Sequence, residues 1–354
     1  MSKQRNSSLE LIRLICIFFV VLWHSFGPYI DNMTGCNLII TSFIHAITNN
    51  TNLLFMLLSG YFGIHLAIDK LIKLDLAIIF YDLAYFFFFA DFSIKGLIAS
   101  CMPIIFKNHW FVSYYFIIAL FSPFLNKIPE RLNRRAFRNL LILLLFLFYV
   151  IPTMFFSEFI EDTGKGIVCM SIMYLIGRYL HLYYYNYHFR RTHLAILHFG
   201  SMLIATILNL MLTKIQGVYM SMYVRDNSIF IVISAISFFL FFRELNFSNT
   251  FINHLIPNVV ILYCIEGYGR HILANYIDLS LYQDSSFFLL AILCFALIVL
   301  IGCTIVNEIR RLLFNCIDNI FTSLIMKFIN KLIPIIKTIY IKVHTYILSF
   351  IGEL

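Results

Sequence analysis

Charged residues are scarce in this sequence. Only 12% of its 354 residues are Asp, Glu, Lys or Arg, against about a quarter in an ordinary soluble domain. Hydrophobic residues make up 61%, which is more apolar surface than a soluble core can bury. No loop is long enough to form an independent soluble domain, and the chain has no internal repeat. These features exclude a soluble globular protein and predict an integral membrane protein.

The patterns required by metal sites and disulfide frameworks are also missing. The eight cysteines form no C-x-x-C pair and no His/Cys cluster with metal-ligand spacing. Most of them lie in apolar stretches, where cysteine behaves as a small hydrophobic residue. The net charge of +8 is spread over short segments between these stretches, and a spread charge indicates membrane topology and not a nucleic-acid partner. We therefore expect no metal, no permanently bound cofactor and no nucleic acid.

Apolar stretches of about 20 residues recur along the chain. With a rise of about 1.5 Å per residue, each can cross a hydrocarbon core of about 30 Å. We predict an all-α fold, a polytopic bundle of about ten transmembrane helices within a membrane domain of residues 1–306. The predicted spans are residues 8–28, 41–66, 74–90, 110–126, 139–156, 166–186, 194–213, 228–243, 254–276 and 286–306.

A different pattern begins at residue 307. Basic residues interrupt an Ile/Leu/Phe-rich stretch that has Pro334 in its middle. We predict that residues 307–354 form a basic tail of amphipathic helices in the cytoplasmic interface; an eleventh span is the alternative. The basic residues of the tail are Arg310, Arg311, Lys327, Lys331, Lys337 and Lys342.

The two sets of loops differ in charge. Short basic loops resist translocation across a membrane, so the asymmetry predicts that both ends of the chain are cytoplasmic. The inside loops contain Lys70, Lys73, Lys127, Arg131, Arg134, Arg135, Arg138, Arg190, Arg191 and Arg243. The outside loops contain Asp31, Glu158, Glu161, Asp162, Asp226, Asp278 and Asp284.

Arg13 and His24 are the clearest candidates for chemistry, because charged and imidazole side chains are costly inside a bilayer. They are eleven residues apart, which places them about 20° apart around one helix and about 16 Å apart along it. A guanidinium at the inner rim suits a phosphorylated ligand, and a deeper imidazole suits a general base. The alternatives are an Arg13 paired with Glu10 and a His24 that bonds a neighbouring helix.

Several segments, taken in order, resemble the acyltransferase-3 family of bacterial membrane proteins, which includes O-antigen and exopolysaccharide O-acetyltransferases. The resemblance covers about the first 180 residues and continues more weakly to about 306. Its segments are SLELIRLICIFFVVLWH (Ser8–His24), NLLFMLLSGYF (Asn52–Phe62), the pair Lys70 and Lys73, WFVSYYFIIALFSPFLN (Trp110–Asn126) and YLIGRYL (Tyr174–Leu180).

The resemblance implies an enzyme in the bacterial plasma membrane. Its donor would be an acyl-CoA, with acetyl-CoA as the default, and its acceptor a hydroxyl of a surface polysaccharide or of its lipid-linked precursor. Arg13, Lys70 and Lys73 would hold the donor phosphates, and His24 would deprotonate the acceptor. Lys70 and Lys73 could equally be topology signals only.

The sequence departs from the family near its ninth span. Many members have Tyr-Leu-Ile-His there, whereas this chain has Tyr263-Cys264-Ile265-Glu266. Glu266 reaches a depth similar to that of His24 and could orient the imidazole as the carboxylate of a triad does. Pairing with Arg270 one turn later is the alternative, and Asp31 is another possible partner of His24.

Two other functional classes stay open from sequence alone. A transporter or flippase for lipid-linked saccharides would also contain buried charges, although no paired Pro/Gly breaks support it. A non-catalytic subunit of a polysaccharide-assembly complex would tolerate the loss of His24.

Overall fold

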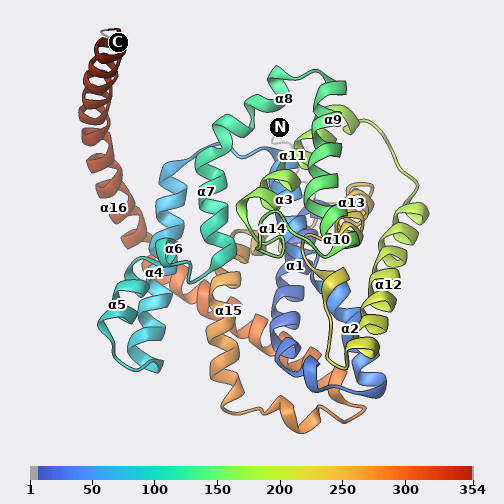
Figure 1. The fold of residues 1–354 in the computed structure, drawn as a ribbon. Coiled ribbons are helices and arrows are strands. Elements are labelled where there is room, and N and C mark those ends of the chain that lie inside the picture. Colours follow the sequence, from blue (N-terminus) through green and yellow to red (C-terminus); the bar gives the residue numbers. More distant parts are fainter. Residues whose placement is uncertain (1–6, 353–354) are drawn as a thin grey trace. The chain divides into compact units, whose positions relative to one another are not determined.

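The computed structural model describes residues 7–352, with side chains through residue 334, and every regular element in this part of the chain is a helix (Figure 1). The chain divides into two compact units. Unit 1 consists of Met1–Leu66 and Ile104–Asn307, and unit 2 of Ala67–Pro103 and Glu308–Leu354. The predicted all-α class is confirmed.

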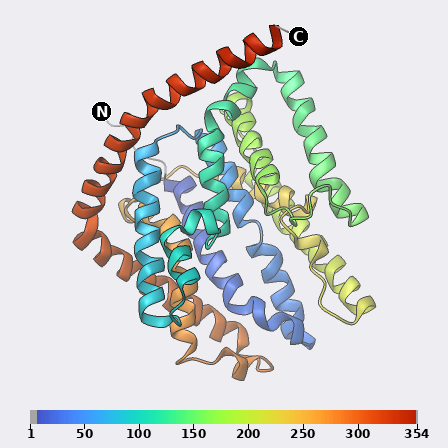
Figure 2. The same cartoon turned by 60° about the vertical axis from the view of Figure 1, so that its left-hand side comes forward.

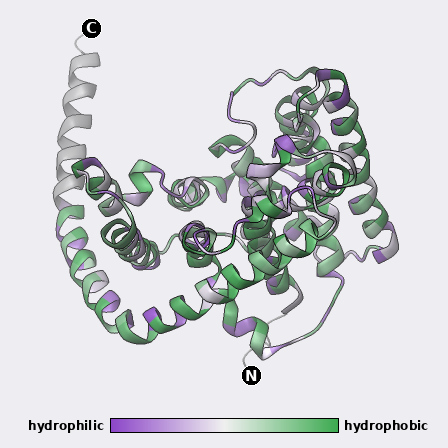
Figure 3. Ribbon diagram, turned by 90° about the horizontal axis from the view of Figure 1, so that it is seen from below, coloured by the Kyte–Doolittle hydropathy of each residue, from purple (hydrophilic) through white to green (hydrophobic). Residues whose placement is uncertain are grey.

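Unit 1 contains most of the helices. In Figures 1 and 2 most of them run lengthwise between its two ends, and hydrophobic residues dominate their ribbons in Figure 3. They are α1 (Ser7–Phe26), η1 (Gly27–Asn32), α2 (Gly35–Thr48), α3 (Thr51–Phe62), α7 (Trp110–Leu125), α8 (Lys127–Arg131), α9 (Arg134–Leu145), η2 (Phe146–Val150), α10 (Ile151–Phe155), α11 (Ile167–Tyr184), α12 (Arg191–Gln216), η3 (Met222–Val224), α13 (Ile229–Arg243), α14 (Thr250–Leu255), η4 (Ile256–Asn258), α15 (Val259–Ala274), η5 (Leu279–Tyr282) and the start of α16 (Phe288–Gly352). Unit 2 contains α4 (Ile68–Phe89), α5 (Ile94–Cys101) and the rest of α16, and the short α6 (Pro103–Phe106) lies at the boundary.

Seven helical segments of the described chain are long and apolar enough to cross a membrane. They make this a multi-pass membrane protein, but the predicted number of ten is not confirmed. The predicted spans 41–66, 74–90 and 166–186 are not among the seven, which are Ser7–Asn32, Trp110–Arg131, Arg134–Phe155, Arg191–Gln216, Met222–Arg243, Thr250–Ala274 and Phe288–Pro334.

The predicted span 41–66 is divided between α2 and α3, and neither half is long enough to cross a bilayer alone. Three side-chain amides at the break donate hydrogen bonds to another part of the chain. Two of them bond the segment just before α13, and one bonds α13. Asn50 Nδ2 donates to Ser234 Oγ (3.1 Å), and Asn52 Nδ2 donates to Asp226 Oδ2 (3.0 Å). The amide of Asn49 donates to the carbonyl oxygen of Val224. The break thus places polar groups inside unit 1 next to α1.

Two glycines bring α3 and α11 into close contact. A Cβ on Gly60 would lie 1.9 Å from the carbonyl oxygen of Tyr174, and a Cβ on Gly177 would lie 2.3 Å from that of Leu57. No side chain fits at either position without a backbone shift. Gly60 and Gly177 therefore permit the close packing of these two helices.

Gly60→Ala is expected to destabilise the protein by about 1–3 kcal/mol, the usual cost of overpacking. The thermal unfolding midpoint of the purified protein measures this effect. Gly200→Ala is the matched control, because a Cβ on that glycine of α12 meets nothing within 4 Å. Equal unfolding midpoints for the two variants would contradict the close contact of α3 and α11.

The loops of unit 1 gather at two opposite ends. At one end Ser7 bonds Asn249, and Arg243 donates to the carbonyl oxygen of Tyr184 (2.8 Å). At the other end Asn37 Nδ2 donates to the carbonyl oxygen of Gln283 (2.9 Å). The first end contains Arg243, which is predicted to be inside, and the second contains Gln283, the neighbour of Asp284, which is predicted to be outside. Which end faces the cytoplasm stays a prediction.

Helix α16 differs from the expected tail. The sequence predicts new amphipathic helices from residue 307, but α16 is one helix from Phe288 to Gly352 and includes Pro334. A proline removes only one backbone donor, and the helix continues on both sides of it. The boundary between the two units does fall on α16 after Asn307. The interfacial location of residues 307–354 stays a prediction.

Candidate active site

His24, Glu266 and Arg270 form a connected polar group between α1 and α15. The Nδ1 atom of His24 lies 2.7 Å from Glu266 Oε1, and Arg270 Nε donates to Glu266 Oε2 at 2.6 Å. Arg270 Nη1 also donates to the carbonyl oxygen of His24 (3.0 Å). Both sequence-based alternatives for Glu266 therefore occur together, because each of its oxygens has its own partner.

The burial of these groups differs in a way that matters for chemistry. The Glu266 side chain is 5% exposed, whereas that of His24 is 34% exposed. A buried carboxylate needs close partners to offset its desolvation, and His24 and Arg270 supply them. An ionised carboxylate only accepts hydrogen bonds, so Nδ1 of His24 donates to it. The Nε2 atom is then the ring nitrogen that can accept a proton from a substrate.

Two cavities reach His24. One, of about 40 Å³, is lined by His24 together with Trp23, Asn52, Trp110, Lys165 and others. The other, of about 270 Å³, is lined by His24 together with Tyr29, Arg270 and others. An imidazole that is fixed by a carboxylate and borders open space can exchange protons with a bound molecule.

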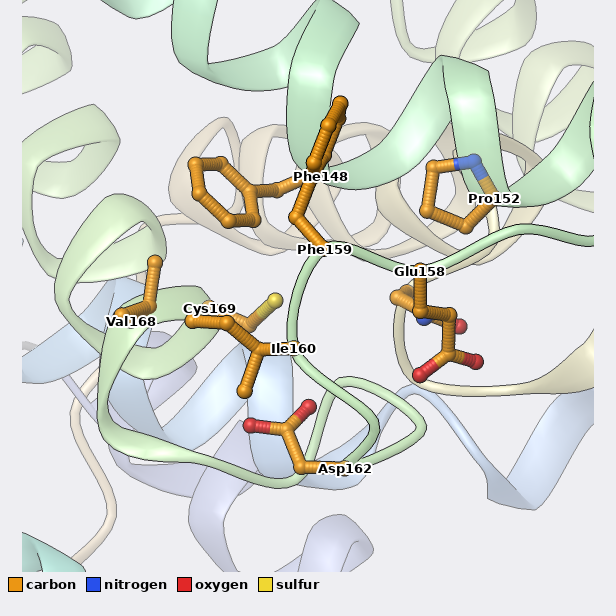
Figure 4. Close-up of a pocket in the computed structure, with 9 residues that line it drawn as sticks. Phe148, Pro152, Glu158, Phe159, Ile160, Asp162, Val168 and Cys169 are labelled. Carbon is orange, nitrogen blue, oxygen red and sulfur yellow. The ribbon is translucent and has the colours of Figure 1, made fainter.

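A smaller cavity lies beneath the loop that joins α10 to α11. Figure 4 shows Phe148, Phe159, Pro152 and Val168 around it, with the carboxylates of Glu158 and Asp162 on the loop. Its volume is about 10 Å³, which is too small for more than about one water molecule. Burial raises the pKa of Asp162, and its Oδ1 accepts from the backbone N–H of Gly164 (2.8 Å). The residues around this small cavity therefore hold the conformation of the loop, and we assign no ligand to the cavity.

Arg13 lies on α1 with His24, and its guanidinium pairs with Glu10. It also lies over the ring of Phe62, 5.5 Å from the centroid. The ion pair between Arg13 and Glu10, given above as the alternative to a phosphate site, is therefore present in the structure. A guanidinium has several N–H donors, so this pair does not prevent Arg13 from binding a phosphate as well.

Lys70 and Lys73 belong to α4 in unit 2, whereas Arg13 belongs to unit 1. Lys70 is exposed. Lys73 Nζ donates to Asn315 Oδ1 and Asn319 Oδ1 at 2.7 Å each. A common donor site of these lysines and Arg13 stays a prediction.

The structure also brings together residues that sequence analysis did not assign to a site. His45 stacks on Trp23, with ring centroids 3.7 Å apart and planes at 9°. Asp31, named above as another possible partner of His24, instead lines a separate cavity with Asp226 and Lys165. The carboxylate that bonds His24 in the described structure is that of Glu266. A histidine within an apolar stretch is a candidate by default, so His45 could have been found; the burial of Asp226 has no sequence signal.

Comparison with known proteins identifies the family. The acyltransferase-3 family model, described as an acyltransferase domain, matches residues 6–308. No curated protein and no solved structure matches the chain significantly. The match covers most of the chain and includes His24, Glu266 and Arg270. The chain therefore belongs to the acyltransferase-3 family of membrane proteins.

Proposed function

We propose that this protein transfers an acyl group, acetyl by default, from acyl-CoA to a hydroxyl of a surface polysaccharide or its lipid-linked precursor. The observation that carries the proposal is the hydrogen bond between His24 Nδ1 and the buried carboxylate of Glu266, next to two cavities, in a member of an acyltransferase family. We place the protein in the bacterial plasma membrane with both termini in the cytoplasm.

The chemistry follows from the state of the imidazole. Nε2 of His24 takes the proton of the acceptor hydroxyl while the hydroxyl oxygen attacks the thioester carbonyl carbon. Glu266 stabilises the imidazolium and Arg270 holds Glu266 in place. When the C–S bond breaks, the CoA sulfur leaves and takes up the proton from Nε2. The products are the O-acyl sugar and free CoA.

The donor is proposed to bind from the end of unit 1 that contains Arg13. Guanidinium and ammonium groups bind phosphate, so Arg13, Lys70 and Lys73 would hold the nucleotide part of CoA. The pantetheine arm would extend along α1 toward His24, and burial of the thioester would exclude water from it.

Replacing both Lys70 and Lys73 by Gln is expected to raise the dissociation constant of acetyl-CoA about 5- to 30-fold, since each charge near the protein surface contributes up to about 1 kcal/mol. Equilibrium binding of acetyl-CoA to the purified variants measures the effect. Changing both residues to Arg should preserve most of the affinity, and Lys327→Gln with Lys331→Gln is the matched control. An unchanged affinity in the Lys70/Lys73 variant would leave these lysines as topology signals only.

The family assignment favours an acyltransferase over the transporter and subunit interpretations. The direct test is to incubate the purified protein with labelled acetyl-CoA and membranes from cells that lack it. We expect label in the glycan fraction. Label that remains entirely in acetyl-CoA and free acetate would contradict the proposed function.

A further inference from the structure

A larger cavity lies beside the one that contains Trp110, His24 and Asn52. Its volume is about 390 Å³, within the range of about 300–1,000 Å³ that is common for small-molecule sites. It is lined by residues of α1, η1 and α2 and of the loops before α11 and α13. Trp23, Asn49 and Lys165 line both cavities, so a ligand in the larger one lies close to His24.

Asp226 lines this cavity and has a buried carboxylate oxygen without a hydrogen-bond donor among the described residues. The residue is 1% exposed. Its Oδ2 accepts from Asn52 Nδ2 at 3.0 Å, but no side chain or backbone group among the described residues donates to Oδ1. A buried acceptor without a donor is costly, so Oδ1 is a site where a ligand O–H or N–H group would bind favourably.

The aromatic wall of the cavity is held in place. Trp23 stacks on His45, and His45 Nδ1 lies 2.8 Å from the hydroxyl of Tyr219. Fixed aromatic rings with a few convergent polar groups are typical of ligand pockets. A pyranose ring has a C–H face that can pack on an indole and hydroxyls that can donate to a carboxylate.

The cavity lining has no excess of positive charge. Asp31 and Asp226 oppose Lys165 and Arg225, and Arg225 is already paired with Glu158 (3.1 Å). A nucleotide phosphate would need an excess of basic groups. The lining therefore favours an uncharged polyhydroxyl ligand over the CoA donor.

We propose that this cavity is the acceptor subsite and binds a neutral sugar residue, which packs on Trp23 and donates a hydroxyl hydrogen bond to Asp226 Oδ1. This inference rests on the proposed acyl transfer. A hydroxyl of the next sugar residue of the glycan would reach His24 through the smaller cavity, which shares Trp23, Asn49 and Lys165 with the larger one.

The test uses tryptophan fluorescence, because Trp23 and Trp110 are the two tryptophans of the chain. In a Trp110→Phe background only Trp23 reports. The probe is a set of oligosaccharides released by mild acid from the surface polysaccharide of the producing cell and then de-O-acylated. We expect a saturable change in emission and an affinity about 10- to 100-fold weaker in Asp226→Asn, as for a lost charge-assisted hydrogen bond. Asp284→Asn, at an exposed loop position outside the cavity, should bind as the background does.

Acyl transfer to the same oligosaccharides separates this inference from the proposed function. Asp226→Asn should raise the KM for the oligosaccharide and leave the KM for acetyl-CoA unchanged. If Asp226→Asn does not fold, Ser221→Phe should abolish binding by filling the cavity. Unchanged oligosaccharide affinity in a folded Asp226→Asn or Ser221→Phe protein, or no emission change in the background protein, would overturn the subsite. Binding that depends on Asp226 without any acyl transfer would support the subsite and contradict the proposed function.

Discussion

Replacing His24 with Ala is expected to reduce the rate of acyl transfer about 10²- to 10⁴-fold, the usual effect of losing a general acid–base group. The affinity for acetyl-CoA should stay near that of the parent, because the imidazole acts on the acceptor proton. Transfer of label from acetyl-CoA to glycan by purified protein measures the rate, and equilibrium binding measures the affinity.

The control for His24→Ala is His193→Ala at an exposed position on α12, which should transfer at the parental rate. Circular dichroism and size-exclusion chromatography establish that both variants are folded. A folded His24→Ala protein with parental activity would reduce His24 to a packing residue and would favour a non-catalytic subunit.

Glu266→Gln is expected to lower kcat about 10²- to 10⁴-fold while the KM values for donor and acceptor change little. The amide keeps the shape of the side chain but loses the charge that stabilises the imidazolium, and in a serine-protease triad the corresponding change has an effect near the upper limit. Steady-state kinetics of the purified variants measure the split between kcat and KM.

A purely structural role for Glu266 predicts a different result. In that case Glu266→Gln would lower the yield or the unfolding midpoint, and the folded fraction would keep the parental kcat. Arg270→Gln should fall between the parent and Glu266→Gln, because it loosens Glu266 without removing the carboxylate. Glu308→Gln, the same substitution in unit 2, should have parental kinetics.

The helical class and the similar depth of His24 and Glu266 could be predicted from sequence for a simple reason. An apolar stretch long enough to cross a membrane forms a helix, because a helix hydrogen-bonds every backbone group within the segment. The depth of one side chain in such a helix follows from its residue number, so His24 and Glu266 could be placed at one level. The sequence could not decide between His24 and Arg270 as the partner of Glu266, and the structure shows that both bind it.

Features that depend on contacts between distant segments could not be predicted. The break between α2 and α3 is satisfied by Val224, Asp226 and Ser234, which lie far away in sequence. The same contacts bury Asp226, which by sequence is one of several acidic loop residues. The continuation of α16 through Pro334 also had no local signal, because proline at that position is typical of a helix end.

Acyl substitution of the surface polysaccharide, measured by NMR or mass spectrometry, tests the central claim most directly. The comparison is between cells that contain the protein, cells that lack it, and cells that lack it but express the His24→Ala variant. We predict O-acyl groups on the polysaccharide only in the first. Identical acyl content with and without the protein would contradict the assignment of a polysaccharide O-acyltransferase.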